Sequence, residues 1–294
     1  MRVVGCVAAL PGPGVGAGRV ASPGVFTPPP DHVLAAFGVA GSRPEVLPGG
    51  RAFRCGDAVI KTVEAPVETA WVATVFEHLQ VPGVRLARPL RASDGRWVVA
   101  GWGAQRFVAG TPAPRYAEII DVSIALHAAL TDVPEPRFFD QRGDLYSRAD
   151  RLAWSGTDRD GLLGDGHGAQ RYAELAAGSR EVTAPRQLVH RDLFGNVLFE
   201  DGSPAVVDVT PTWRPAGFGA AVVAVDAVAW GGADTGLLER FGQLPQWGQL
   251  LRRALMFRLA VSLLHPRTTA SSLVDMLATV EVIRPALDSG PDQS

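Results

Sequence analysis

Several residue types are scarce in this chain of 294 residues. It has one lysine, Lys61, among 28 basic residues, and one asparagine, Asn196. It has two cysteines, Cys6 and Cys55, whose surroundings indicate no shared disulfide, so we expect a reducing, cytoplasmic location. No apolar run approaches the roughly 18 residues that cross a bilayer, so we expect no membrane partner.

The balance of charge excludes another class of partner. The formal net charge is −2, and the arginines are scattered without forming a basic stripe. We therefore expect no binding to nucleic acid. With 47% hydrophobic residues the chain can bury a substantial core, and its length suits one two-lobed unit or two small domains.

The first 29 residues combine proline and glycine without an apolar period. Glycines at positions 12, 14, 16 and 18 imitate a dinucleotide-binding turn, but nearby prolines prevent the helix that this motif requires. Such a composition cannot offset the entropy lost on ordering. We predict that residues 1–29 form a disordered or non-native extension.

The next part of the chain predicts an antiparallel sheet of about five strands with one main helix. Short apolar segments separated by glycine turns indicate strands at 45–47, 52–55, 58–63, 86–91 and 96–108. Pro66 suits the first turn of a helix over 67–79.

Helical spacing in this segment points Glu68 toward the interior, where a carboxylate needs a cation. Lys61 is the candidate partner for Glu68, and Glu77 ranks second as the acid for Lys61. Alternatively, Glu68 only stabilises the first turn of its helix through the dipole.

The rest of the chain is mainly helical in pattern, apart from a turn-rich segment at 212–218. We predict helices at 32–37, capped by Asp31, and at 116–130, 143–154, 169–177, 220–230, 237–241, 246–264 and 271–283. His127 is expected to be a core or capping residue. Asp226 is the one acid in an apolar helix, so backbone donors or an arginine should satisfy it.

The segment QLVHRDLFGNVLFEDGSPAVVDVTP, residues 187–211, carries the strongest functional pattern. It predicts a strand, a polar turn, and a hairpin with its turn at residues 201–202. We expect Asp192, Asn196 and Asp208 at one end of a small sheet, where their oxygens can hold a hard cation and orient a hydroxyl. A local alternative is that these side chains only cap turns and end strands.

The scarce residue types favour the functional interpretation. The single asparagine lies in this segment, and the single lysine lies on a predicted strand upstream. A compact ammonium fits against phosphate oxygens in a tight slot, where the longer planar guanidinium of arginine cannot replace it.

These residues resemble the protein-kinase-like fold, closest to its aminoglycoside phosphotransferase and choline kinase branch. The resemblance implies an α+β, two-lobed fold. Residues 30–108 would form a nucleotide-binding lobe with a small antiparallel sheet and one main helix. Residues 109–288 would form a larger, helical lobe that carries catalysis and binds the acceptor.

The resemblance also implies an ATP-dependent phosphotransferase that moves the γ-phosphoryl group of ATP, or GTP, to a hydroxyl of a small molecule. In that family the residue matching Asp192 orients or deprotonates the acceptor hydroxyl. Those matching Asn196 and Asp208 bind Mg²⁺, and the one matching Lys61 contacts the nucleotide phosphates. Glu68 would hold Lys61 in place.

Two positions depart from the family pattern. Asn196 follows Asp192 by four residues, one fewer than in most relatives, and Arg191 stands where the antibiotic-phosphorylating branch usually has glycine. One alternative function is therefore a nucleotide-binding pseudokinase that acts as a scaffold or sensor. A second is a metal-dependent hydrolase in which Asp192, Asn196 and Asp208 act on water.

Overall fold

The computed structural model describes residues 27–48 and 52–288. Of the extension predicted over 1–29, residues 1–26 lie outside this part, as does the turn predicted at residues 49–50. The described chain divides into two compact units. The first contains the residues up to Ala113 together with Gly195–Pro211, and the second contains Pro114–Phe194 and the residues from Thr212 onward.

The first unit is built on an antiparallel sheet. Six strands pair in the order β1-β2-β3-β7-β5, with β6 also paired to β7, where about five were predicted. The elements of this unit are α1 Asp31–Ala36, β1 Glu45–Val46, β2 Ala52–Cys55, β3 Ala58–Thr62, α2 Pro66–Phe76, β4 Arg85–Leu86, β5 Pro89–Leu90, β6 Val98–Val99, β7 Trp102–Arg106, β9 Val197–Glu200 and β10 Ser203–Val206.

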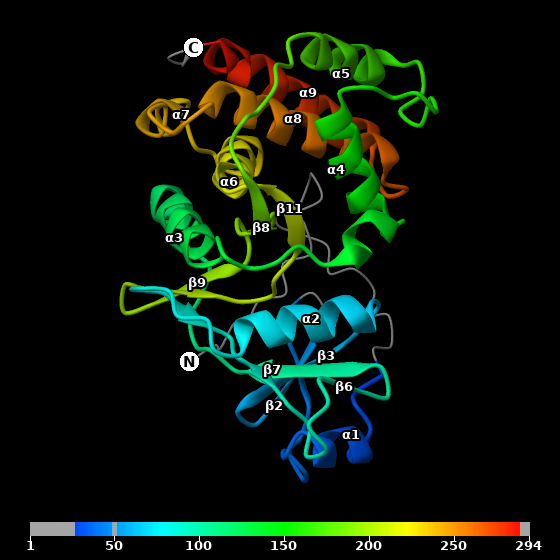
Figure 1. Cartoon of the computed structure of the whole chain (residues 1–294), viewed down its shortest axis with the longest axis vertical. Coiled ribbons are helices and arrows are strands. Elements are labelled where there is room, and N and C mark those ends of the chain that lie inside the picture. Colours follow the sequence, from blue (N-terminus) through cyan, green and yellow to red (C-terminus); the bar gives the residue numbers. More distant parts are fainter. Residues whose placement is uncertain (1–26, 49–51, 289–294) are drawn as a thin grey trace. The chain divides into compact units, whose positions relative to one another are not determined.

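Side-chain alternation divides the two faces of this sheet. Phe53 of β2 is directly opposite Ile60 of β3, and both pack into one apolar cluster with Val33 of α1. Because neighbouring residues of a strand face opposite sides, Lys61 lies on the other face. Figure 1 shows α1 and α2 on opposite sides of the sheet. Asp31 does not cap α1 as predicted: it is the first helical residue, after Pro30, where its charge still favours the helix dipole.

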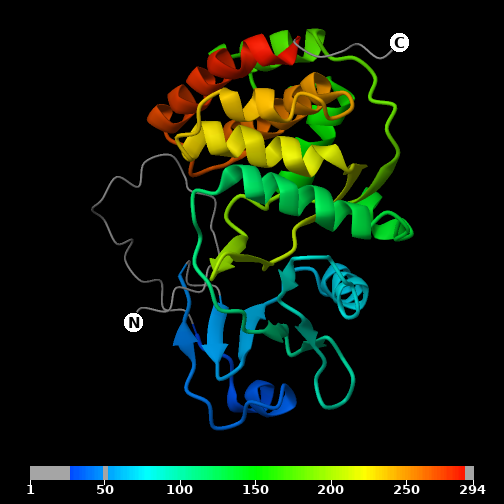
Figure 2. The same cartoon turned by 90° about the vertical axis from the view of Figure 1, so that its left-hand side faces the viewer.

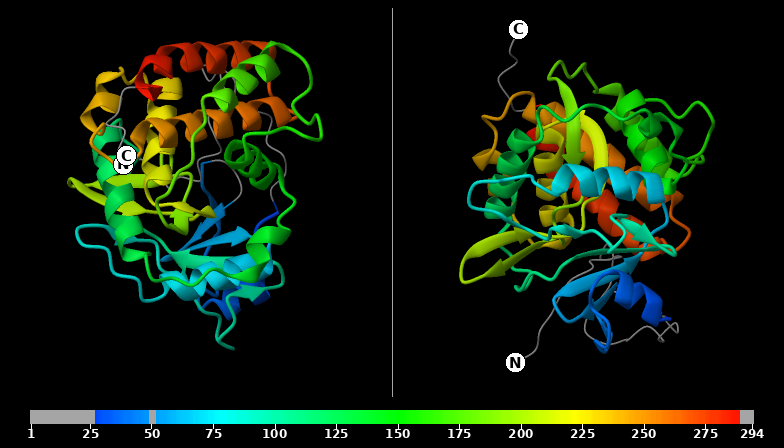
Figure 3. Two further views of the ribbon diagram at one scale, coloured as in Figure 1. Left: turned by 45° about the horizontal axis from the view of Figure 1, so that its top comes forward. Right: turned by 60° about the horizontal axis from the view of Figure 1, so that its bottom comes forward.

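A hairpin from much later in the sequence completes the first unit (Figure 3). Asp201 and Gly202 form its two-residue turn with φ values of 48° and 81°, as a type I′ turn requires. β10 pairs in parallel with β4. Thr111 and Phe199 exchange two backbone hydrogen bonds of 3.0 and 2.9 Å, which attach the other strand, β9, to the same unit.

The second unit is mainly helical, and α8 lies at its centre. α8 packs against α4, α5, α6 and α9, and α6 also packs against α3; Figure 2 shows α3, α6 and α8 as successive layers. Of the described helices, none is long and apolar enough to cross a membrane. The elements are α3 Tyr116–Ala129, η1 Arg137–Gln141, α4 Leu145–Ser155, α5 His167–Ala177, β8 Arg186–His190, β11 Pro211–Pro215, α6 Gly217–Trp230, α7 Gly236–Arg240, α8 Trp247–Leu264, α9 Ala270–Ile283 and η2 Arg284–Leu287.

The prediction for the segment 212–218 is wrong, and the predicted strands 86–91 and 96–108 are each divided into two short strands. Residues 212–218 are not a turn-rich connection, because Pro211–Pro215 forms β11, which pairs with β8. Proline is tolerated on an edge strand, and the buried Trp213 anchors this strand against the interior. Pairing with a strand about twenty residues upstream leaves no local pattern that sequence inspection detects.

The hairpin turn gives a test of the first unit. Gly202→Ala should lower the free energy of unfolding by about 1 kcal/mol, because a side chain disfavours the left-handed conformation at φ 81°. A Cβ at this position would meet no heavy atom within 4 Å, so crowding adds nothing. Urea unfolding measures the change. Gly143→Ala, at an equally open site without a positive φ, is the control, and equal losses in both variants would contradict the prediction.

Candidate functional site

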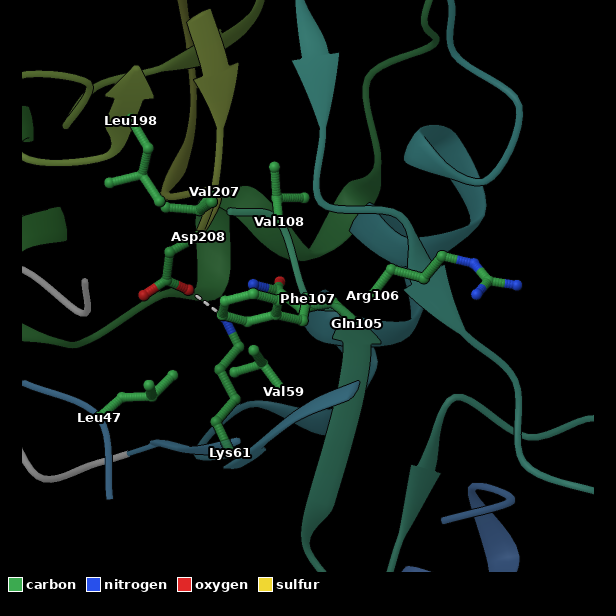
Figure 4. A pocket seen from close by; sticks show the side chains of 10 residues that line it. All are labelled: Leu47, Val59, Lys61, Gln105, Arg106, Phe107, Val108, Leu198, Val207 and Asp208. Carbon is green, nitrogen blue, oxygen red and sulfur yellow. Dashed lines mark hydrogen bonds and ion pairs between the residues drawn. The ribbon is translucent and has the colours of Figure 1, made fainter. Parts of the chain in front are cut away.

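A narrow recess in the first unit has two apolar walls. Leu47 and Val59 come from the sheet region, and Leu198 and Val207 come from the β9–β10 hairpin (Figure 4). Residues 105–108, at the end of β7, lie along one side. Two apolar walls and a stretch of backbone suit a flat heterocycle.

Charged side chains meet in this recess. Nζ of Lys61 donates a hydrogen bond to Oδ1 of Asp208, and the two side chains are 29% and 26% exposed. Figure 4 shows Lys61 pointing from β3 toward Asp208. Asp208 has φ 55°, a left-handed conformation that aspartate adopts more readily than most residues. The structure therefore brings together the lysine and the downstream aspartate that the sequence singled out.

Asn196 lies at the same end of the hairpin as Asp208. Its carbonyl accepts a 2.9 Å hydrogen bond from the N–H of Val207, which extends the pairing of β9 with β10 by one residue. Asn196 is only 3% exposed. A carboxylate and an amide oxygen are ligands that Mg²⁺ accepts, so Asn196 and Asp208 stay the predicted ligands for such an ion.

Glu68 lines a second recess, which Lys61 and Asp208 also line. The helical neighbours Val72 and Phe76 line it too, so Glu68 lies on the face of α2 that borders this recess. Its pairing with Lys61 stays a prediction. Glu77, the second candidate for Lys61, instead accepts two 2.8 Å hydrogen bonds from Arg91 at the surface.

Asp192 belongs to the second unit, in the loop after β8. Its Oδ1 accepts a 3.0 Å hydrogen bond from Nη2 of Arg258 on α8. Arg258 also donates from Nε to Oδ1 of Asp226 at 2.7 Å and from Nη2 to Oδ2 of the same carboxylate. Asp226 thus has the arginine partner that its apolar helix predicted. The sequence analysis did not identify Arg258 as this partner. An arginine in the mostly apolar segment 250–261 needs an acid in the same way that Asp226 needs a cation.

Burial and charge act in opposition in this network. Arg258 is 2% exposed and Asp226 is 1% exposed. Burial raises the pKa of Asp226 to about 7, against the opposing charge of Arg258. Burial alone would lower the pKa of Arg258, but the carboxylates of Asp226 and Asp192 outweigh it and raise that pKa. Removing one member would leave a buried charge without compensation.

Two histidines hold the backbone around Asp192. The N–H of Asp192 donates to Nδ1 of His190 at 3.2 Å, and the N–H of His190 donates to Nε2 of His127 at 2.9 Å. Burial lowers the pKa of His127 to about 3, so its ring is neutral. Because Nε2 accepts, we assign the proton to Nδ1, which donates to the hydroxyl of Ser123 at 3.2 Å. His127 is a buried core residue, as predicted.

Arg191 points into the helical interior. Its guanidinium carbon lies 5.6 Å from the centre of the Phe257 ring, and its Nη1 donates to the carbonyl of Tyr146 at 3.3 Å. The side chain is 3% exposed, and burial lowers its pKa. The large residue at this position therefore packs between α4 and α8.

Comparison with known proteins finds likeness in structure. No family model matches the chain, and no curated protein has a significant sequence match. The amicoumacin kinase hAmiN, solved in complex with AMP-PNP, Ca²⁺ and Ami, has 14% identity and a TM-score of 0.59 over 88% of this chain and 93% of its own.

Two further solved structures have the same fold. The aminoglycoside phosphotransferase APH(4)-Ia has 15% identity and a TM-score of 0.51 over 89% of this chain and 99% of its own. The choline kinase LicA from Streptococcus pneumoniae has 10% identity and a TM-score of 0.50 over 83% and 93%. The chain therefore has the α+β, protein-kinase-like fold of small-molecule phosphotransferases, which confirms the fold and the structural resemblance predicted from its sequence.

The neutral His127 gives a pH-dependent test. The unfolded chain protonates this histidine near pH 6.5, whereas the folded chain does so only near pH 3. The unfolded state therefore binds more protons between these values, and stability falls as the pH drops below 6.5. His127→Gln keeps an acceptor for the N–H of His190 but loses this titration.

Relative to His127→Gln, the wild type should lose roughly 1.4 kcal/mol of unfolding free energy per pH unit below pH 6. Urea unfolding of both proteins at pH 7.5, 6.0 and 5.0 measures the difference. Parallel pH profiles would show that His127 is protonated in the folded state.

Proposed function

We propose that this protein is a small-molecule kinase that transfers the γ-phosphoryl group of ATP, or GTP, to a hydroxyl with the help of Mg²⁺. The observation that carries the proposal is the contact between Lys61 and Asp208 in a recess with two apolar walls. An ammonium and a carboxylate beside a slot for a flat ring match the needs of a nucleotide with its phosphates and metal ion. The fold shared with small-molecule kinases supports it.

Each charged residue has a part in holding the nucleotide. Lys61 neutralises phosphate oxygens, and Glu68 limits the positions that the lysine adopts. Asn196 and Asp208 hold Mg²⁺, which supplies positive charge to the phosphates. The base lies between the apolar walls, with the backbone of residues 105–108 at its edge. Such chemistry depends mainly on positioning and charge neutralisation, so few side chains suffice.

Asp192 acts on the acceptor. Its carboxylate accepts a hydrogen bond from the acceptor hydroxyl and orients the oxygen toward the γ-phosphorus atom. It takes up the proton as the new O–P bond forms, while the bond between the γ-phosphorus and the β,γ-bridging oxygen breaks and the nucleoside diphosphate leaves. The acceptor proposed is a small molecule, because solved structures that share this fold include small-molecule kinases. Neither nucleic acid nor a membrane is proposed as a partner.

Nucleotide binding tests the first part of the proposal. Lys61→Met should weaken the binding of Mg·ATP at least about 10-fold, because a charge-assisted contact with phosphate is lost. Asp208→Asn should reduce the effect of Mg²⁺ on binding, and EDTA should weaken binding to the wild type. Isothermal titration calorimetry with ATP and GTP measures these changes.

Arg106→Met is the matched control for this test. Arg106 also lines the recess, but its side chain is exposed and points away from Lys61 and Asp208 (Figure 4). This variant should bind Mg·ATP with nearly the wild-type affinity. Equal losses in Lys61→Met and Arg106→Met would mean that general charge, and not the Lys61–Asp208 site, attracts the nucleotide.

Phosphate transfer tests the second part. A screen with Mg·ATP over aminoglycosides, sugars, amino alcohols and nucleosides should reveal a product in the wild type. Asp192→Asn should lower its rate by about 10²–10⁴-fold while Mg·ATP binding stays the same. Nucleotide binding without transfer to any acceptor would indicate a pseudokinase. Release of ADP that no acceptor changes would indicate a hydrolase.

A further inference from the structure

Three buried arginines lie on α8, and they do different things. Arg252 donates to the carbonyl of Leu175 and to the carboxylate of Asp288. Arg253 donates to the carbonyls of Ala153 and Arg180. These contacts tie helices and connecting segments together. Arg258, further along the same helix and only 2% exposed, instead reaches the carboxylate of Asp192.

The guanidinium of Arg258 has little freedom to move. Two of its nitrogens bind both oxygens of Asp226 on α6, and one of these nitrogens also binds Asp192. Its central carbon lies 5.6 Å from the centre of the Trp230 ring and 5.1 Å from that of Phe257. Because the guanidinium is planar and held in this way, the N–H of Nη2 that reaches Asp192 points in a fixed direction. The position of Oδ1 of Asp192 is therefore set by two packed helices and not by its loop alone.

We propose that Arg258 is a positioning residue for Asp192, and that Asp226 orients Arg258 for this task. The inference rests on the proposed function, in which Asp192 receives the acceptor hydroxyl. Arg258 holds one carboxylate oxygen of Asp192 in place, and its positive charge compensates the negative charges of Asp192 and Asp226. His190 accepts a hydrogen bond from the backbone N–H of Asp192, so Asp192 is held both at its N–H and at its carboxylate.

Kinetics of Arg258 variants test this role. The probe is ADP release from Mg·ATP in a fixed mixture of kanamycin, ethanolamine, glucose and uridine. Arg258→Gln should lower kcat about 100-fold and leave the KM for ATP within about two-fold, because Arg258 acts on the acceptor side of the reaction. Arg258→Lys keeps the charge but loses the fork, so it should recover only part of the loss.

Arg253→Gln is the matched control, because Arg253 is also buried on the same helix and donates hydrogen bonds to the backbone carbonyls of Ala153 and Arg180. It should lower the unfolding midpoint and leave kcat nearly unchanged. A purely structural role for Arg258 would make the two glutamine variants alike in kcat, and that result would overturn the inference.

Rescue by a small cation provides a second measurement. In Arg258→Gly, millimolar guanidinium should enter the vacated space and raise kcat at least about 10-fold, since it restores the lost donors. It should not raise kcat in Arg253→Gly or in Asp192→Asn. Equal stimulation of all three variants would reject a specific role for the guanidinium of Arg258.

Unfolding separates this inference from the proposed function. If Arg258 holds Asp192, the unfolding midpoint of the Arg258→Gln/Asp192→Asn double variant differs from the sum of the single effects. Additive effects would reject the contact, whatever the activity. A wild type that neither binds Mg·ATP nor releases ADP, but shows this coupling, would reject the proposed function and leave the link between Arg258 and Asp192 standing.

Discussion

The contact between Lys61 and Asp208 joins residues that are 147 positions apart, and the site in the first unit depends on it. Two independent constraints place its members. Alternation along β3 turns Lys61 away from the face that Ile60 buries, and the left-handed conformation of Asp208 turns the chain at the end of β10. The two side chains would not meet without the hairpin, which β4 and Thr111 attach to the same unit.

Charge compensation is the corresponding constraint in the second unit. An apolar helix that contains one aspartate and a buried helix that contains arginine are each unfavourable alone. Packed together, α6 and α8 pair Asp226 with Arg258, and the same guanidinium reaches Asp192. A contact that buries two opposite charges thus also holds the carboxylate of Asp192. The neutral His127 supports the neighbouring backbone without adding charge.

Much of the architecture could be predicted, because helices and hairpins arise from local patterns. The helices near 116–130, 220–230 and 246–264 follow from their apolar composition, and residues 201–202 from turn chemistry. Partners that lie far apart in the sequence could not be predicted. β11 forms because β8 is available as a partner, and Glu77, the lower-ranked acid for Lys61, binds Arg91.

The sequence alone determined which residues could serve the proposed chemistry. The single lysine, Lys61, stands out by scarcity, and Asn196, Asp192 and Asp208 stand out by scarcity or spacing in the segment 187–211. Only the tertiary structure decided their partners: Asp208 for Lys61, and Arg258 for both Asp192 and Asp226. The physical reason is that local preference acts over a few neighbouring residues, whereas pairing of buried charges depends on which distant elements pack together.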